Sequence, residues 1–134
     1  MPDPNGTNSS QNSALEIIMG VLGTTLATGP QKDYIEVPWN CTIFRWTLLG
    51  DETGSVQVDV WNCQESAFDG GATHPTVGDS IVAGNFPTIS GSTKGQDTVL
   101  AGWTRTLVGG SIIGLNINSV ASIQKLTLSL EVYR

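Results

Sequence analysis

The residues best suited to catalysis lie in and around one glycine-rich loop. His74 is the only histidine of the chain, and it precedes Pro75 in the segment FDGGATHP, residues 68–75. A nucleophilic triad needs a base, usually a histidine, that a carboxylate orients. The sequence has no GxSxG motif and no glycine pattern for phosphate binding. We therefore interpret His74 as a solvent-exposed loop residue.

Carboxylates offer a second kind of chemistry, because two of them can cleave a glycosidic bond or contribute ligands to a calcium ion. Asp69 and Asp79 flank the same loop, but no calcium-loop motif surrounds them. A catalytic or calcium-binding role for this pair is the less favoured interpretation. Asp51 and Glu52 lie in a predicted turn, where they are interpreted as solvated charges. We predict that the protein is not an enzyme and has no catalytic residues.

Metal and disulfide chemistry depend on the two cysteines. Cys41, Cys63 and His74 do not have the spacing of a standard zinc site. We therefore predict no bound metal and no cofactor. Two cysteines do not make a disulfide framework. The sequence leaves open whether they form a bridge or remain thiols.

Tryptophans could bind a sugar by stacking on its ring. We predict that Trp46 faces the core and that Trp61 faces outward, and Trp103, which follows a glycine at a strand end, is a further candidate for exposure. An outward tryptophan more often covers a neighbouring subunit than a ligand. Trp61 and Trp103 are therefore candidate subunit or partner contacts.

Composition limits the classes of protein that this chain can belong to. It has 134 residues, enough for one domain with a substantial core. Charged residues make up 13%, and there are 16 glycines, a balance typical of sheets joined by many turns. The net charge of −6 argues against nucleic-acid binding, which needs basic clusters. We find no signal peptide and no apolar run long enough to span a membrane.

Period-two alternation predicts most of the strands. Residues 41–49 and 55–63 alternate on either side of a turn at 50–54, which indicates an antiparallel hairpin. Ile43 and Trp61 would then face outward together and contact another subunit, and Cys41 would lie opposite Cys63. The same register gives one shared inward face, formed by Phe44, Trp46, Leu48, Val56, Val58 and Val60.

The remaining alternation extends over the rest of the chain from residue 14. We predict an all-β fold, an antiparallel, jelly-roll-like β-sandwich of about eight strands, in a single domain of residues 14–134. The additional strands are expected at Leu15 to Val21, Lys32 to Val37, Ser80 to Ala83, Thr88 to Ile89 and Thr98 to Trp103, with a closing hairpin of Ile112 to Asn118 and Ile123 to Tyr133.

Several segments resemble a β-sandwich module of virion structural proteins of tailed bacteriophages. They are YIEVPWNCTIFRWTLLGDETGSVQVDVW (34–61), PTVGDSI (75–81), PTISGSTKGQDTVLAGWT (87–104) and LNINSVASIQKLTLSLEV (115–132). The resemblance covers roughly residues 32–132. It implies no catalytic residues. Two departures are the lack of a long fibrous stalk before the module and the segment VGGSI at 108–112, where an acidic residue is expected after the glycine.

The resemblance implies a structural role in a virion. Without a stalk, the chain is expected to be a capsid decoration, or cement, protein on the capsid exterior, assembled in the host cytoplasm. Its expected partner is the major capsid protein, which it would bind as a homotrimer and stabilise. The alternative is a tail-fibre tip or adhesin that binds a host surface glycan. A small carbohydrate-active enzyme and a trimeric jelly-roll signalling ligand are further alternatives.

The first 13 residues are predicted to be a flexible N-terminal arm. They contain no aliphatic residue after Met1, so they cannot offset the entropy of ordering by packing on their own domain. Pro2 and Pro4 favour extended chain, which can add to the sheet edge of a neighbour. We expect this arm to become ordered only in the assembly, with Pro2 and Pro4 as candidate contacts.

Overall fold

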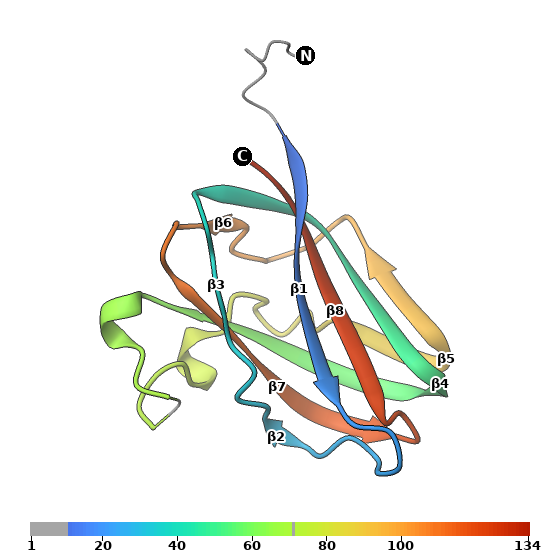
Figure 1. Cartoon of the computed structure of the whole chain (residues 1–134). Helices are drawn as coiled ribbons and strands as arrows, with labels where there is room; N and C mark the ends of the chain where they lie inside the picture. Colours follow the sequence, from blue (N-terminus) through green and yellow to red (C-terminus); the bar gives the residue numbers. More distant parts are fainter. Residues whose placement is uncertain (1–10, 71) are drawn as a thin grey trace.

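The chain folds almost entirely as β-structure. The computed structural model describes residues 11–70 and 72–134, and within them every strand ladder is antiparallel (Figure 1). The predicted all-β fold of about eight strands is confirmed. The described strands are β1 (Asn12–Gly20), β2 (Gly29–Pro30), β3 (Ile35–Glu36), β4 (Cys41–Cys63), β5 (Thr88–Asp97), β6 (Thr106–Leu107), β7 (Ile112–Ala121) and β8 (Lys125–Tyr133), with 3-10 helices η1 (Glu65–Ala67) and η2 (Val77–Asp79).

One sheet forms both layers, because it folds across its longest strand. The hydrogen-bonded order is β1-β8-β4-β7-β2. Residues 42–50 of β4 pair with β8, and residues 55–63 pair with β7. We call β1, β8 and residues 41–50 of β4 layer one. Layer two comprises residues 55–63 of β4 together with β7, β2 and β3. Strand β5 pairs with both halves of β4 and follows the bend (Figure 1).

The predicted hairpin of residues 41–49 and 55–63 is wrong. These residues belong to one long, bent strand, and its two halves have other partners on both edges. Trp46 pairs with a residue of β5 and a residue of β8, and Val56 pairs with a residue of β5 and a residue of β7. A bent strand and a hairpin produce the same period-two pattern, so alternation did not distinguish them.

The predicted closing hairpin of residues 112–118 and 123–133 is wrong for the same reason. Strand β7 lies in layer two between β4 and the short strands β2 and β3. Strand β8 lies in layer one between β1 and β4. The turn between β7 and β8 therefore crosses from one layer to the other, alongside the bend of β4.

The bend in β4 requires a glycine at position 54 for lack of space, not for a left-handed backbone conformation. Neither Gly50 nor Gly54 has a positive φ. A Cβ built on Gly54 would instead lie 2.3 Å from the carbonyl oxygen of Ala121 and 2.8 Å from Cγ1 of Ile123. Glycine is needed here because the two bends, in β4 and between β7 and β8, approach each other closely.

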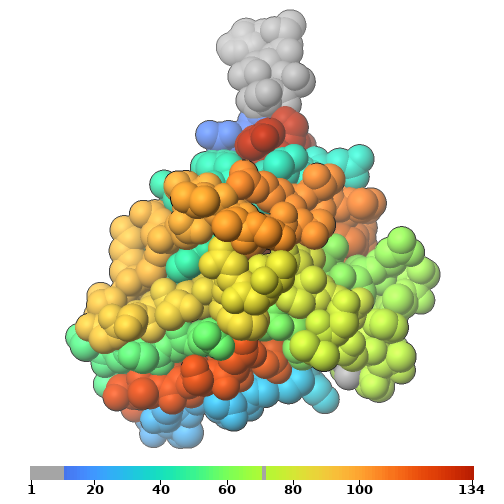
Figure 2. Space-filling model, turned by 180° about the vertical axis from the view of Figure 1, so that it is seen from behind, coloured from blue at the N-terminus to red at the C-terminus, as the bar shows by residue number. Residues whose placement is uncertain are grey.

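The core lies between the two layers. Trp46 is 6% exposed, which confirms its predicted inward position. Figure 2 shows that residues 80–107, coloured yellow to orange, form much of the surface on the side away from the view in Figure 1. Along this segment the chain contributes buried apolar side chains to the same core, namely Ile81, Val82, Ile89, Leu100, Trp103 and Leu107.

Three of the expected strands are shorter or absent. Residues 32–37 contribute only the two-residue strand β3, and residues 80–83 contribute a single bridge between Ser80 and Trp61. Residues 98–103 form turns, because the carboxylate of Asp97 accepts hydrogen bonds from the backbone N–H groups of Val99 and Leu100. Leu100 then has a φ of 52°, which ends the extended chain.

The first strand starts slightly earlier than the sequence pattern indicates. Asn12 and Ser13, which the sequence assigns to the arm, pair with Tyr133 and Val132. Strand β1 is therefore nine residues long and runs in register along the whole of β8. The rest of the predicted arm, residues 1–10, lies outside the described residues.

Candidate functional site

The outer face of layer one is an open surface built from cross-strand rows of side chains. Strand pairing places Glu16, Ser129, Thr47 and Gln96 in one such row across β1, β8, β4 and β5. These side chains are polar and half-buried or exposed. No described segment of this chain packs over them as a further layer (Figure 1). Such a surface is suited to contacts with another molecule.

An ion pair fixes the side chains on this face. Arg45 and Glu131, a cross-strand pair, form a salt bridge. Thr47 Oγ1 also donates a hydrogen bond to Glu131 Oε1 at 2.8 Å, and Gln96 Nε2 donates to Thr47 Oγ1 at 3.3 Å. The hydrogen bond from Arg45 holds the pKa of Glu131 below its usual value. The carboxylate therefore remains charged at neutral pH, and these hydrogen bonds order the side chains of Arg45, Thr47 and Gln96.

Apolar and basic side chains gather at one end of the same face. Ile18 is 57% exposed and Leu49 is 48% exposed, although both lie on strands. Both residues pair with Thr127 of β8, which lies between them. Leu49 also pairs with Lys94 of β5, on the side away from β8. Ile18, Leu49 and Lys125 line a shared hollow of about 230 Å³. We call Ile18, Leu49, Lys94 and Lys125 the basic end cluster.

Around Asp59 and Trp61, the outer face of layer two is covered by the protein itself. Asp59 and Trp61 point to this face, yet they are 4% and 7% exposed. Trp61 Nε1 donates to Asp59 Oδ2 at 2.9 Å, and Ser80 Oγ donates to Asp59 Oδ1 at 2.6 Å. The carboxylate thus has a hydrogen-bond partner on each oxygen. This network attaches the chain around Ser80 to the sheet and contains no histidine base.

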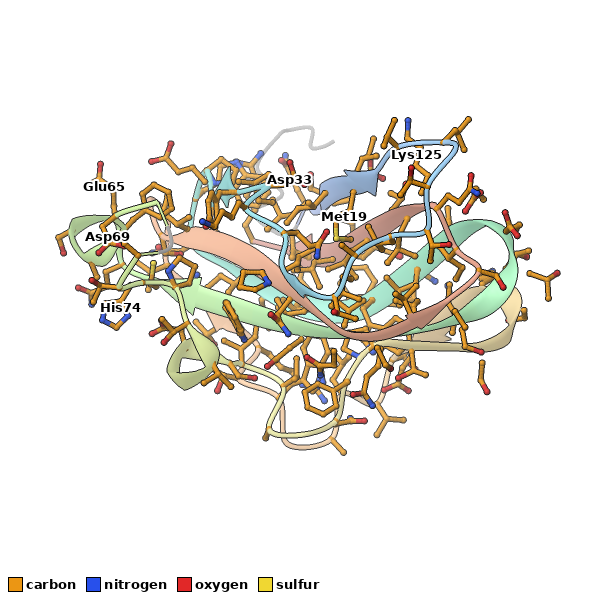
Figure 3. The ribbon with its side chains drawn as sticks, turned by 90° about the horizontal axis from the view of Figure 1, so that it is seen from below. Met19, Asp33, Glu65, Asp69, His74 and Lys125 are labelled. Atoms are coloured by element: carbon orange, nitrogen blue, oxygen red, sulfur yellow. The ribbon has the colours of Figure 1, made fainter. Side chains whose placement is uncertain are left out.

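The loop of residues 64–80 is held by two further carboxylates. Asp69 Oδ1 accepts hydrogen bonds from the backbone N–H groups of Thr73 and His74, which lower the pKa of Asp69 to about 2. Asp79 Oδ2 lies 2.9 Å from His74 Nδ1 and accepts a hydrogen bond from the backbone N–H of Thr76. Both carboxylates are therefore engaged within the loop, where Asp69 and His74 lie near each other (Figure 3). His74, predicted to be a solvent-exposed loop residue, is half-buried, and 41% of its side chain is accessible.

The placement of the cysteine, histidine and acidic side chains bears on metal and disulfide chemistry. Within residues 11–70 and 72–134, no group of three or more histidine, cysteine, aspartate or glutamate side chains is placed to hold a metal ion. Cys41 and Cys63 are buried free thiols at the two ends of β4. Burial raises the pKa of each thiol. Their predicted cross-strand placement is wrong, because the two halves of β4 do not pair.

The three contact residues predicted within the domain are all buried in this chain. Ile43 is fully buried because a bulge between Ile43 and Arg45 shifts the alternation by one residue, so that Phe44 turns partly outward. Trp61 is covered by the loop that follows it. Trp103 is 7% exposed, and its Nε1 donates to the Asn85 carbonyl at 2.9 Å. Their predicted exposure is therefore wrong.

The other two predicted contacts, Pro2 and Pro4, lie outside the described residues. The burial of Ile43 and Trp61 also removes the apolar patch on which the sequence argument for a homotrimer depended.

The tryptophans do not form an open platform for a sugar ring. Trp46, Trp61 and Trp103 are buried. Trp39 is half-buried, and the guanidinium carbon of Arg134 lies 4.4 Å from its ring centroid. An aromatic face that is already covered by a cation is poorly placed to stack on a ligand.

One hollow of the described surface is acidic. It has a volume of about 430 Å³ and lies where β3, η1 and the segment after β6 meet. Glu36 and Glu65 are exposed at its wall, and Val108, 63% exposed, contributes an apolar side chain. Gln64, Ser66 and residues 109–111 complete the lining. We call this feature the acidic hollow. Sequence reasoning did not identify it, because its residues come from three separate segments.

Comparison with known proteins gives a likeness of structure rather than of sequence. No protein-family model matches the chain, and no curated protein matches it. It is similar to a chain of the cyanophage Pam1 capsid asymmetric unit, with 19% identity, a TM-score of 0.45 and coverage of 93% of this chain and 86% of that one. It is also similar to a chain of the complex between an Aeromonas sobria serine protease and its chaperone, with 5% identity, a TM-score of 0.36 and coverage of 99% of this chain and 29% of that one.

One further finding concerns membranes. In the part of the chain that the structure describes, no helix is both long enough and apolar enough to cross a bilayer.

Proposed function

We propose that this protein is a non-enzymatic structural component of a tailed-phage virion, a decoration protein that attaches as a homotrimer to the shell of the major capsid protein and stabilises it. The observation that carries the proposal is the contrast between the two outer faces. Layer two is covered by the chain itself around Asp59 and Trp61, whereas layer one presents an open surface of rows across four strands. The resemblance to phage virion modules supplies the kind of partner.

The chemistry of the open face suits attachment to a large protein surface. Thr47, Thr127 and Ser129 are short and hydroxylated, and the ion pair between Arg45 and Glu131 is already formed, so ordering these side chains on binding costs little entropy. A flat surface of this kind can form many weak contacts over a wide area. Binding to repeated sites on a shell then gains strength from the number of subunits attached.

The proposal contains no catalytic step. Asp59, Asp69 and Asp79 hold the loop of residues 64–80 through hydrogen bonds to side chains or backbone groups. A glycan-binding tail tip is not supported by a specific feature, since three tryptophans are buried and the guanidinium group of Arg134 lies over the ring of Trp39. Turnover of a glycan that is lost in Asp79→Asn would contradict the proposal.

A shell-binding assay tests the proposal directly. Ser129→Arg places a long charged side chain in the middle of the open face, whereas Asn118→Arg places the same side chain on exposed β7 of layer two. Shells assembled from the major capsid protein of the same virus are incubated with each variant and sedimented. We expect Ser129→Arg to weaken attachment about tenfold, or about 1.4 kcal/mol, and Asn118→Arg to bind as the native protein does. Equal attachment of both variants would mean that layer one is not the attachment face.

A further inference from the structure

Two surfaces of opposite charge lie at opposite ends of the molecule. Figure 3 shows Lys125, in the basic end cluster, at one end, and Glu65, in the acidic hollow, at the other. Because the two lie so far apart, one chain cannot bring them into contact. A contact between them has to join two different molecules.

The charged groups of both surfaces are available to a partner. Lys94, Lys125, Glu36 and Glu65 are all exposed, and none forms an ion pair with another described residue. Lys94 adds a smaller favourable interaction to Glu131, below the hydrogen bonds that already hold this carboxylate. Each surface therefore carries charge that the fold does not neutralise by direct pairing.

The acidic neighbour of the basic end cluster is already engaged. Asp51 lines the same hollow as Lys125, but its Oδ1 accepts hydrogen bonds from the backbone N–H groups of Gln124 and Lys125, at 2.8 and 3.0 Å. These bonds, with that of Lys125 contributing most, lower the pKa of Asp51. The Asp51 carboxylate therefore holds the turn before β8, and the Lys125 ammonium group remains exposed.

The two surfaces also match in their apolar groups. Ile18 and Leu49 lie beside the lysines in the basic end cluster, and Val108 lies beside the glutamates in the acidic hollow. Aliphatic side chains exposed to this degree on a small domain are typical of contact surfaces when they cluster. A contact with an apolar centre and an ionic rim follows from this arrangement.

The net charge limits how copies can associate. With a net charge of −6, two copies repel each other unless a basic surface of one meets an acidic surface of the other. A two-fold contact confined to one of these surfaces would place lysines against lysines or glutamates against glutamates, because each surface would then meet its own copy. A head-to-tail contact pairs the two different patches, and repeated around a closed ring it produces a cyclic oligomer.

We infer that the basic end cluster of one copy packs against the acidic hollow of the next, and that this head-to-tail contact builds the trimer. The inference depends on the proposed function for the size of the ring. The contact itself rests on the placement of the two patches. Lys94 and Lys125 face Glu36 and Glu65 of the adjacent copy, and Ile18 and Leu49 cover Val108.

A charge-swap experiment tests the contact with the isolated protein. The variant Lys94→Glu/Lys125→Glu makes the chain more acidic, and Glu36→Lys/Glu65→Lys makes it less acidic. Both place like charges opposite each other in the contact. The variant with all four substitutions restores opposite charges with the signs exchanged, and its net charge equals that of the native chain. Each association constant is measured by sedimentation equilibrium at low and at physiological salt.

We expect each double substitution to weaken association by at least about tenfold and the fourfold variant to recover most of it. An effect of net charge alone would instead move the two double variants in opposite directions. A native protein that stays monomeric up to several hundred micromolar overturns the contact. So does a fourfold variant that stays dissociated. Shell binding is measured separately with Ser129→Arg, so the contact can fail while the proposed attachment face stands.

Discussion

The two halves of β4 have opposite environments although they belong to one strand. In the first half, outward residues such as Thr47 and Leu49 lie on an open surface. In the second half, outward residues such as Asp59 and Trp61 are buried under the loop that follows. Alternation of polar and apolar residues records the face to which a side chain points. Whether that face is solvated depends on segments elsewhere in the chain.

The largest expected effect comes from removing a covered side chain of layer two. Trp61→Ala empties a buried site and leaves Asp59 without one of its two hydrogen-bond donors. We expect a loss of about 3–5 kcal/mol in the free energy of unfolding, measured by urea denaturation. Thr47→Ala, at an outward position of layer one, should cost about 1 kcal/mol or less. Similar losses for the two variants would show that outward side chains contribute equally to stability on the two halves of β4.

The junction of the two layers is tested by Gly54→Ala. The added methyl group would approach the carbonyl oxygen of Ala121, a backbone atom that cannot rotate away. We expect a loss of about 1–3 kcal/mol in the free energy of unfolding. Gly78→Ala is the matched control, because the nearest atom to its Cβ is Thr76 Oγ1 at 3.7 Å and its φ is not in the left-handed region. If Gly54→Ala unfolds at the same urea concentration as Gly78→Ala, the two bends do not constrain each other.

The smallest effect is expected from the loop that covers layer two, and it depends on pH. The pKa of Asp69 is about 2 in the folded protein and about 3.9 in an unfolded chain. Since the folded value is the lower one, its contribution to stability is present above about pH 4 and is lost as the pH falls toward 2. Asp69→Asn should therefore be less stable than the native protein at pH 7, and the difference should shrink over that window.

Urea midpoints of native protein and Asp69→Asn at pH 7, 4 and 2.5 check this expectation. If the difference in urea midpoint between the two proteins were the same at all three pH values, the two backbone hydrogen bonds of Asp69 would not stabilise the fold. Amide hydrogen exchange at Thr73 and His74 reports the same contact locally, and we expect faster exchange in the variant.

The fold class and much of the core could be predicted from the sequence, because inward residues such as Trp46 and Leu48 repeat with period two. Strand partners could not be predicted in this way, since hairpins and bent strands share that period. The outward assignment of Ile43 failed because the bulge at Phe44 changes the register, and nothing in the residue types marks the bulge. Trp61 was misplaced because its cover comes from residues further along the chain.

The candidate surfaces were less predictable than the fold. Ile18, Leu49 and Lys125 are far apart in sequence, and they meet only because β8 pairs with both β1 and β4. Glu36 and Glu65 meet through the packing of a two-residue strand and a single 3-10 turn. Neither cluster has a local motif. The only local signal was the pair Ile17-Ile18, which places one isoleucine on each face of β1.

The pairing of β1 with β8 determines the order in which the protein can fold during translation. Strand β1 is synthesised before every other described strand, and its partner β8 after all of them, with Asn12 paired to Tyr133. The apolar side chains of β1 therefore have no strand partner until β8 has been synthesised. Contacts this distant in sequence form slowly, because a long loop must close before they stabilise anything. Layer one can therefore be completed only after β8, which pairs with both β1 and β4, has been synthesised.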